Sequence, residues 1–196
     1  MNIPTVIFIT ALNAAGKGMV VERLCSNYGF SAHSVRKFLN EHTERQTVIV
    51  DRPGLGTLAD KFRDKYGPEY IIKSLFEEST AMRTNIVIES VRCPGEVDYI
   101  MNLKEIHKGV IDIVLVSVEA DIDVRYERAK ARGSITDNVT FDEFKAQELA
   151  ESIGTEPGRM NIPKCMERAD ARILNNTNNV DDLDAEIRLK LLRPIF

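Results

Sequence analysis

The sequence predicts an α/β fold around a parallel sheet, and three apolar runs of strand length are the first indication. They span residues 6–9, 86–88 and 111–118, and the first and third are followed by helical patterns. The second indication is a Gly-Lys-Gly directly after the first run, at residues 16–18. A strand, a tight loop and a helix N-terminus in this order form a phosphate site, because the loop N–H groups and the helix dipole both favour an anion there.

The loop after the first strand follows the general phosphate-binding pattern of Gly, four residues, Gly-Lys and a hydroxyl residue, with departures. Gly16 and Lys17 keep the curvature and the charge of the pattern, and Lys17 is the candidate for holding the terminal phosphates. Ala11 replaces the first glycine, and neither Gly18 nor Met19 supplies the hydroxyl that usually binds magnesium. An ordinary strand-to-helix turn with a solvated lysine is the alternative.

A chain of 196 residues with 43% hydrophobic and 29% charged residues is typical of one globular domain. The formal net charge of −4 argues against a surface that binds nucleic acid over its whole extent, but it leaves room for a local basic cleft. Cys25, Cys93 and Cys165 lack metal-ligand spacing and predict no disulfide framework. No signal peptide or transmembrane pattern is present, so we expect a cytoplasmic protein without nucleic-acid or membrane partners, and the oligomeric state stays open.

A polar cluster follows the first helix. A short strand-like stretch over 30–34 leads into a second helix, with Ser34 as its N-cap. Because ligands gather at the carboxyl edge of an open parallel sheet, Ser34, Arg36 and Lys37 are candidates for holding a second, phosphorylated substrate. A helix cap followed by two solvated cations is an equally simple interpretation.

The strand over 86–89 ends in an acid and is followed by an arginine. Glu89 stands at its carboxyl end, where a carboxylate suits magnesium or a water on the metal. Arg92 lies three residues further on, and its planar guanidinium suits a phosphate. A simple Glu89–Arg92 ion pair is the alternative, but the phosphate loop makes the same sheet edge a site already, which favours the functional interpretation.

Arginine recurs along the helix expected over 121–132. Arg125, Arg128 and Arg132 are spaced i, i+3 and i+7, which puts the three guanidinium groups along one helix face. Acidic residues come first in this helix and cations last, so matching of the helix dipole is the alternative explanation. Dipole matching explains the gradient of charge well, and the choice of arginine at three positions on one stripe less well.

The remaining elements follow from periodicity, breakers and caps. Residues 51–54 mark a turn, Pro68 suits a first helical position, and Thr140 with Glu143 forms a capping box. The expected helices cover 18–27 (ended by Gly29), 35 onward, 58–66, 68–80, 121–132 (ended by Gly133), 141–152, 164–169 and 180–192, and a last strand at 171–174 precedes a polar turn at 175–179.

Four blocks of residues, read in order, resemble those of a known family. They are Asn13 to Gly18, Ile88 to Glu96, Arg125 to Ser134, and Asn161 to Asp170 with Asn175-Asn176. In these blocks, and over nearly its whole length, the chain is similar to P-loop kinases of the nucleoside monophosphate kinase group, closest to those labelled adenylate-kinase-like or dephospho-CoA-kinase-like. The resemblance implies a three-layer P-loop NTPase fold in one domain, 1–196, with a five-stranded parallel sheet flanked by helices, a helical insertion over about 36–80 that covers the acceptor, and a lid over about 121–153.

The resemblance also implies ATP as phosphate donor, Mg²⁺ as cofactor and a nucleotide-like acceptor such as a (deoxy)nucleoside monophosphate. Lys17 would hold the donor phosphates, and Arg92 would bind the phosphate of the acceptor. Arg128 and Arg132 would contact the nucleotide and neutralise the transferring group when the lid closes. The implied donor-binding residues are Asn13, Ala14, Ala15, Gly16, Lys17, Gly18, Met19, Arg128, Asn175 and Thr177, the last two beside adenine.

Two departures from the family pattern bear on activity. Met19 stands where the family carries Thr, and residues 37–40 lack the arginine of the family's Asp-x-Leu-Arg, for which Arg36 is the candidate replacement. Phosphoryl transfer depends on positioning and charge neutralisation, so the absence of a paired histidine and acid is no objection. Three hypotheses stay open: a nucleotide kinase, which leads; a kinase for dephospho-CoA or another small acceptor; and a catalytically weak nucleotide-binding protein, which Met19 favours.

Overall fold

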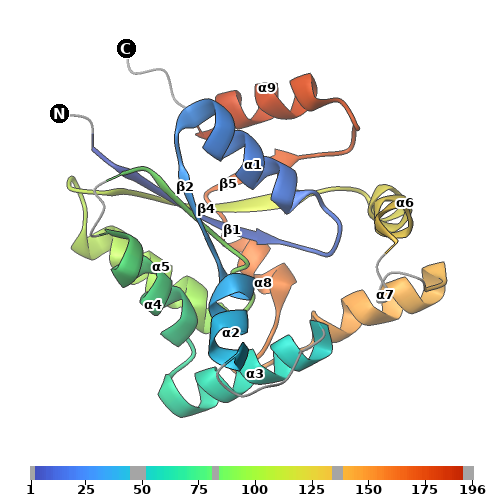
Figure 1. Cartoon of the computed structure of the whole chain (residues 1–196), viewed down its shortest axis with the longest axis horizontal. Helices are drawn as coiled ribbons and strands as arrows, with labels where there is room; N and C mark the ends of the chain where they lie inside the picture. Colours follow the sequence, from blue (N-terminus) through green and yellow to red (C-terminus); the bar gives the residue numbers. More distant parts are fainter. Residues whose placement is uncertain (1–2, 45–51, 81–83, 134–138, 192–196) are drawn as a thin grey trace.

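The computed structural model describes residues 3–44, 52–80, 84–133 and 139–191, and these form a three-layer α/β fold (Figure 1). The strands are β1 (Thr5–Ala11), β2 (Ser31–Ser34), β3 (Ile86–Glu89), β4 (Asp112–Glu119) and β5 (Ala171–Leu174). The helices are α1 (Lys17–Tyr28), α2 (Val35–Glu44), α3 (Arg52–Tyr66), α4 (Tyr70–Thr80), α5 (Pro94–Ile106), α6 (Ile122–Arg132), α7 (Phe141–Ala150), α8 (Ile162–Glu167) and α9 (Val180–Leu191).

The sheet has five strands in the order β2-β3-β1-β4-β5, and all four pairings are parallel, which confirms the predicted fold class. Its register brings the ends of β2 and β3 level, because Glu89 pairs with both Ile9 and Ser34. The strand order reverses between β1 and β4, which pair along the full length of β1. In an open parallel sheet the carboxyl edge at such a switch point is where ligands bind.

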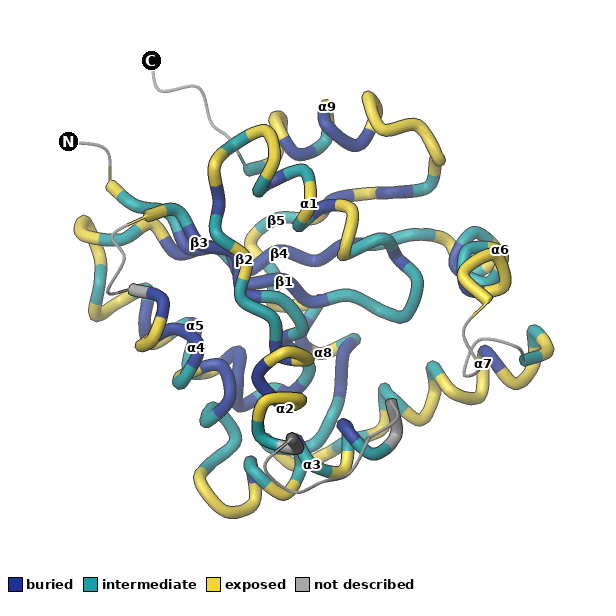
Figure 2. The backbone as a smooth tube through the Cα atoms, viewed as in Figure 1, coloured by how far each residue is buried: buried dark blue, intermediate teal, exposed yellow. Residues whose placement is uncertain are grey.

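Alternation along β1 explains the two helical layers. Ile7 and Ile9 belong to the core that α1 and α9 cover, whereas Val6 and Phe8 face a second core under α2, α3, α4, α5 and α8. Figure 1 shows α1 and α9 on one side of the sheet and α4, α5 and α8 on the other. Figure 2 shows the three central strands β3, β1 and β4 as largely buried, whereas the edge strands β2 and β5 and the outer faces of the helices are more exposed.

Helix ends confirm several of the predicted caps. The α1 helix ends at Gly29, whose φ of +70° is in the left-handed region that a glycine adopts without strain. Gly133 closes α6 in the same way, with a φ of +62°. The capping box of α7 is present, because Thr140 accepts from the Glu143 amide and Glu143 accepts from the Thr140 amide.

Three local predictions were wrong. Helix α3 begins at Arg52 rather than at residue 58, so the expected turn at 51–54 is instead its first turn, apart from residue 51, which lies outside the described residues. Proline within a first helical turn removes no helical hydrogen bond, and it therefore starts this helix instead of breaking the chain. Helix α4 begins at Tyr70, and Pro68 lies in the turn before it.

Helix α5 was not predicted at all, although its start carries a recognisable signal. Pro94 occupies the first turn, and Glu96 at the third helical position accepts from the backbone of Cys93 in a capping box. This helix follows β3 directly and so anchors the residues between them, 90–93, at the sheet edge.

Two global expectations concern cysteines and membrane segments. All three cysteines are free thiols, in agreement with the predicted absence of a disulfide framework. Within the described ranges, no helix combines the length and the apolar character that crossing a membrane requires.

Candidate active site

The phosphate loop occupies the turn between β1 and α1. Ala14 and Gly16 have φ values of +58° and +92°, so the chain reverses through left-handed conformations. Gly16 also allows a close approach: a Cβ built on it would lie 2.0 Å from the side-chain nitrogen of Asn175. That nitrogen donates to the carbonyl of Ala15 at 2.9 Å, so a buried amide from the β5–α9 turn holds the loop in shape.

Lys17 and Glu89 form an ion pair at the carboxyl edge of the sheet. Their side chains are 24% and 18% exposed, so the pair is half-buried and accessible. Burial lowers the pKa of the Lys17 ammonium, and Glu89 beside it only partly offsets this. Burial raises the pKa of the Glu89 carboxyl, but the charge and hydrogen bond of Lys17 outweigh it, and the net shift is downward. Glu89 is therefore an anion at neutral pH that is ion-paired with Lys17. The sequence indicated that it either binds magnesium or pairs with Arg92, and the pair with Lys17 was not predicted.

The polar residues after β2 lie around the same carboxylate. The hydroxyl of Ser34 and the charge of Arg36 both lower the pKa of Glu89. Ser34 also accepts from the amide of Lys37 at 3.5 Å, the geometry of a weak N-cap. The structure thus brings Ser34 and Arg36 to the Lys17–Glu89 pair, while Lys37 reaches toward Glu41, 3.8 Å away along α2.

Arg92 lies on the same edge, in the connection between β3 and α5. Its positive charge acts on Lys17 and lowers the pKa of that ammonium, after the larger effect of burial. Its guanidinium is 3.8 Å from the sulfur of Met160 and 4.0 Å from the carboxylate of Glu151, and its side chain is 31% exposed. Arg92 is therefore accessible, and like Arg36 it is close enough to Lys17 for its charge to lower the pKa of that lysine.

The predicted arginine stripe on α6 faces the phosphate loop. Arg132 donates to the side-chain oxygen of Asn13 at 3.2 Å, and Arg125 reaches the carbonyl of Asn13 at 3.5 Å. Arg128 lies between them, 3.8 Å from the position that a Cβ on Gly16 would take. These guanidinium groups stand against the loop in this structure. Their approach to donor phosphates on closure of 121–153 stays a prediction, and residues 134–138 of that segment lie outside the described residues.

Arg125 differs from its two neighbours because it is buried. Its guanidinium is ion-paired with Glu148 of α7, and its Nε donates to the carbonyl of Ala120 at 2.8 Å. Arg125 is only 4% exposed and lines a cavity of about 140 Å³ under the loop, together with Leu12, Ala15 and others. Arg125 therefore has a structural role, because it links α6 to α7 and to the loop. Arg128 and Arg132 are more exposed and remain accessible to a ligand.

The β5–α9 turn lies against Arg128. The carbonyls of Asn175 and Thr177 accept from the Arg128 guanidinium at 2.8 and 2.7 Å, and desolvation lowers the pKa of this arginine. The hydroxyl of Thr177 donates to Asp182 at 3.0 Å, close to the first turn of α9. Asn175 thus contacts the phosphate loop, whereas Thr177 contacts Arg128, and the contact of both residues with adenine stays a prediction.

Sequence reasoning missed two buried residues that support this edge. The Glu96 carboxylate accepts from the backbone amide of Arg92 at 2.7 Å. The backbone amide of Asn161 donates to the Arg92 carbonyl at 2.9 Å. Both are caps, at the third position of α5 and at the N-cap of α8. The Pro-x-Glu pattern at 94–96 and the Asn-x-Pro pattern at 161–163 were the available signals.

The fold is that of P-loop kinases. A strand–loop–helix that carries Gly16 and Lys17 lies beside the switch point of a five-stranded parallel sheet. Solved structures agree. The Thermus thermophilus protein TT1252 superposes with a TM-score of 0.63 at 19% identity, covering 96% of each chain. Shikimate kinase from Bacteroides thetaiotaomicron gives a TM-score of 0.57 at 12% identity, covering 94% of this chain and 95% of that one.

Relatives in sequence are archaeal proteins called UPF0200. The UPF0200 protein of Pyrobaculum aerophilum is 25% identical over 187 residues, which cover 95% of this chain and 97% of that protein. The one from Thermococcus kodakarensis is 23% identical over 189 residues, covering 93% and 94%. No family model matches the chain.

Proposed function

We propose that this protein is an ATP-dependent phosphotransferase that acts on a phosphorylated, nucleotide-like acceptor. The observation that carries the proposal is the set of cations around one carboxylate: Lys17 paired with Glu89, and Arg36 and Arg92 on the same sheet edge. Several positive charges at a strand–loop–helix junction suit a reaction in which phosphate groups meet and negative charge must be neutralised.

The donor side of the proposal is ATP on residues 13–19. The loop amides and the α1 N-terminus would cradle its phosphates, and Lys17 would move from Glu89 to the terminal phosphates. Arg128 and Arg132, which already stand against the loop, would contact the same phosphates from the other side. Asn175 and Thr177 would border the adenine.

Magnesium fits this site through Glu89. Carboxylate oxygens are the ligands that Mg²⁺ prefers, and the metal is commonly held by one or two carboxylates together with substrate phosphates and waters. Among the described residues no cluster of three or more potential ligands exists, so Glu89 would be the protein's contribution and phosphates and waters the rest. The bound metal would supply charge neutralisation at the transferring phosphoryl group.

Replacing Met19 with threonine should therefore preserve or raise magnesium affinity in the presence of ATP. Met19 is 44% exposed, so the change leaves no cavity, and it restores a hydroxyl next to the loop. Titrating Mg²⁺ against ATP turnover in wild type, Met19→Thr and Glu89→Gln would measure this. We expect Glu89→Gln to weaken magnesium; an unchanged magnesium requirement in that variant would contradict the assignment.

Substituting Arg128 or Arg132 with alanine should lower kcat by about 10-fold or more and weaken ATP binding much less. The reason is that the charge on the transferring group is largest in the transition state, where an arginine contact is strongest. Turnover and ATP affinity measured side by side would test it. Lys130→Ala is the matched control, because Lys130 lies on the same helix with a 53% exposed side chain beside Glu127. Equal losses in binding and rate would favour simple ground-state attraction instead.

The acceptor should carry a phosphate, because Arg36 and Arg92 offer two guanidinium groups near Lys17 that would bind it. A nucleoside monophosphate is the first candidate. Dephospho-CoA or another small molecule is the second, and similarity of fold to a shikimate kinase and to a gluconokinase from Sinorhizobium meliloti (TM-score 0.51, 14% identity) supports keeping it. A protein that binds nucleotide with little catalysis is the third, favoured by Met19.

One experiment separates these three candidates. ADP release from ATP is coupled to a spectroscopic readout and followed across nucleoside monophosphates, dephospho-CoA, shikimate and gluconate, with Lys17→Ala as the inactive reference. Turnover with a nucleoside monophosphate supports the leading proposal, and turnover only with another acceptor supports the second. ATP binding by calorimetry without ADP release from any of them would favour the third.

A further inference from the structure

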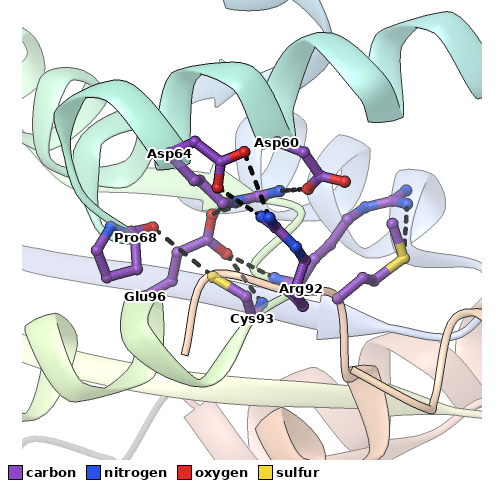
Figure 3. A network of polar contacts seen from close by, with 9 residues as sticks. Asp60, Asp64, Pro68, Arg92, Cys93 and Glu96 are labelled. Atoms are coloured by element: carbon purple, nitrogen blue, oxygen red, sulfur yellow. Dashed lines mark hydrogen bonds and ion pairs between the residues drawn. The ribbon is translucent and has the colours of Figure 1, made fainter. Parts of the chain in front are cut away.

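The Glu96 carboxylate is fully buried and lies at the junction of three segments of the chain. It is at the third position of α5, under the β3–α5 connection that carries Arg92 and against helix α3. Figure 3 shows Glu96 there, with dashed contacts running to the backbone of Arg92 and Cys93. A carboxylate with no exposure is costly unless its charge is paired and its oxygens are bonded, so its partners are informative.

The two oxygens of Glu96 divide their partners. Oε1 accepts from Nη2 and Nε of Arg63 at 2.9 and 3.2 Å, and Oε2 accepts from the backbone amides of Arg92 and Cys93 at 2.7 and 3.2 Å. Arg63 is itself buried; burial alone would lower the pKa of its guanidinium, but Glu96 outweighs this and raises that pKa. One oxygen of the carboxylate thus forms an ion pair with Arg63 on α3, and the other accepts hydrogen bonds from the main chain of Arg92 and Cys93.

The main chain of Arg92 is held on its other side as well. Its carbonyl accepts from the Asn161 amide at 2.9 Å. Three residues on, Gly95 donates to the carbonyl of Pro157 at 2.8 Å, and a Cβ built at Gly95 would lie 2.5 Å from Pro68. The backbone at 92–95 is therefore tightly enclosed, while the Arg92 side chain is 31% exposed at the sheet edge.

Stability alone does not account for this arrangement. A buried ion pair is often no better for stability than apolar residues of similar volume, because desolvation offsets the attraction. What an apolar pair could not do is accept the Arg92 and Cys93 amides. We propose that Glu96 is a positioning residue: its carboxylate fixes the backbone of Arg92 so that the guanidinium meets the acceptor phosphate, and Arg63 holds that carboxylate in place.

This inference rests on the proposed function, in which Arg92 clamps the acceptor. It assigns Glu96 an effect on the acceptor and none on the donor, because its bonds reach Arg92 and Cys93 and not the phosphate loop. The expected signature is a raised acceptor KM at unchanged ATP KM, a selective effect that general destabilisation of the fold would not produce.

The test uses two double variants of the full chain that both remove the buried charges. Arg63→Met with Glu96→Gln keeps an amide oxygen that accepts from the Arg92 backbone, whereas Arg63→Met with Glu96→Met keeps none. We expect the first to retain the acceptor KM within about 3-fold, and the second to raise it about 10-fold. The second should also melt at a lower temperature, because two buried amides lose their acceptor, so both variants are assayed well below their melting temperatures. Amide hydrogen exchange at Arg92 and Cys93 should be faster in the second variant only.

The third arm asks whether Glu96 acts through Arg92. In an Arg92→Ala background, adding Arg63→Met and Glu96→Met should raise the acceptor KM no further, as expected for residues that act as one unit. Additive effects, or two double variants that behave alike in KM and in amide exchange, would overturn the inference. Failure of the kinase proposal is recognised separately, as no turnover by wild type with any acceptor; the exchange rates at Arg92 and Cys93 then still decide whether Glu96 fixes that backbone.

Discussion

Turnover should fall about 100-fold or more when Lys17 is replaced by alanine, while the fold survives. One cation that neutralises charge in the transition state is worth about 3 kcal/mol, which corresponds to that factor. Lys17 is the loop cation at the β1–α1 junction, and its present partner is Glu89. The melting temperature should change little, since this accessible pair contributes only modestly to stability.

Two controls make the Lys17 result interpretable. Lys145→Ala removes a lysine whose side chain is 47% exposed beside Asp142, on α7, and should leave kcat and KM unchanged. Lys17→Met keeps most of the aliphatic stem and removes only the charge, so it should be as inactive as Lys17→Ala if charge is the operative property. Near-normal turnover in Lys17→Ala would place the donor site elsewhere in the molecule.

Local patterns were sufficient to predict most of the fold. Apolar runs located β1, β3 and β4 within a residue or two, and Gly29 and Gly133 marked helix ends because a left-handed residue there is nearly always glycine. Thr140 and Glu143 predicted the start of α7 because reciprocal capping is encoded within four residues. The errors came where proline had two possible roles, at the starts of α3, α4 and α5.

In the candidate site, too, local spacing predicted some features, whereas contacts between residues distant in the sequence could not be predicted. The i, i+3, i+7 spacing predicted that Arg125, Arg128 and Arg132 share a face, and they do, against the phosphate loop. Spacing does not show that Arg125 is buried against Glu148, 23 residues away in the sequence. The same limit applies to the Lys17–Glu89 pair, which is separated by 72 residues and depends on β1 and β3 being neighbours.

Long-range partners also explain why a simple ion pair between Glu89 and Arg92 was a poor alternative. Glu89 is the last residue of β3 and turns toward Lys17, while Ser90, with a φ of +78°, redirects the chain that follows. Arg92 consequently starts from a backbone fixed by Glu96 and extends toward the side of Met160. The left-handed turn is not visible in a local pattern, and the Pro-x-Glu pattern at 94–96 signals the start of a helix but not the burial of the Glu96 carboxylate.

Replacing Arg92 with alanine should raise the acceptor KM about 10- to 100-fold, or lower kcat to match, and leave ATP affinity nearly unchanged. A charge-assisted contact to phosphate is worth about 1.5–3 kcal/mol, which sets this range. In the proposed function Arg92 contacts the acceptor, and its effect on Lys17 is that of its charge, so the donor phosphates should not sense its loss directly.

Conservative and remote variants sharpen the Arg92 test. Arg92→Lys should recover activity only in part, because an ammonium cannot replace a two-pronged guanidinium. Arg36→Ala should show a milder form of the same phenotype, since Arg36 is exposed at the start of α2. Arg168→Ala is the matched control, an arginine with a 40% exposed side chain that is paired with Asp98.

The deciding measurement is ATP and acceptor affinity side by side for each of these variants. If Arg92→Ala weakened ATP as much as the acceptor, Arg92 would belong to the donor site and the division of this sheet edge into two sites would be wrong. If instead Arg36→Ala proved the more severe, α2 would carry the main acceptor contact, and the β3–α5 connection would assist it. A selective loss of acceptor binding in Arg92→Ala is the result that the geometry around Lys17 and Glu89 leads us to expect.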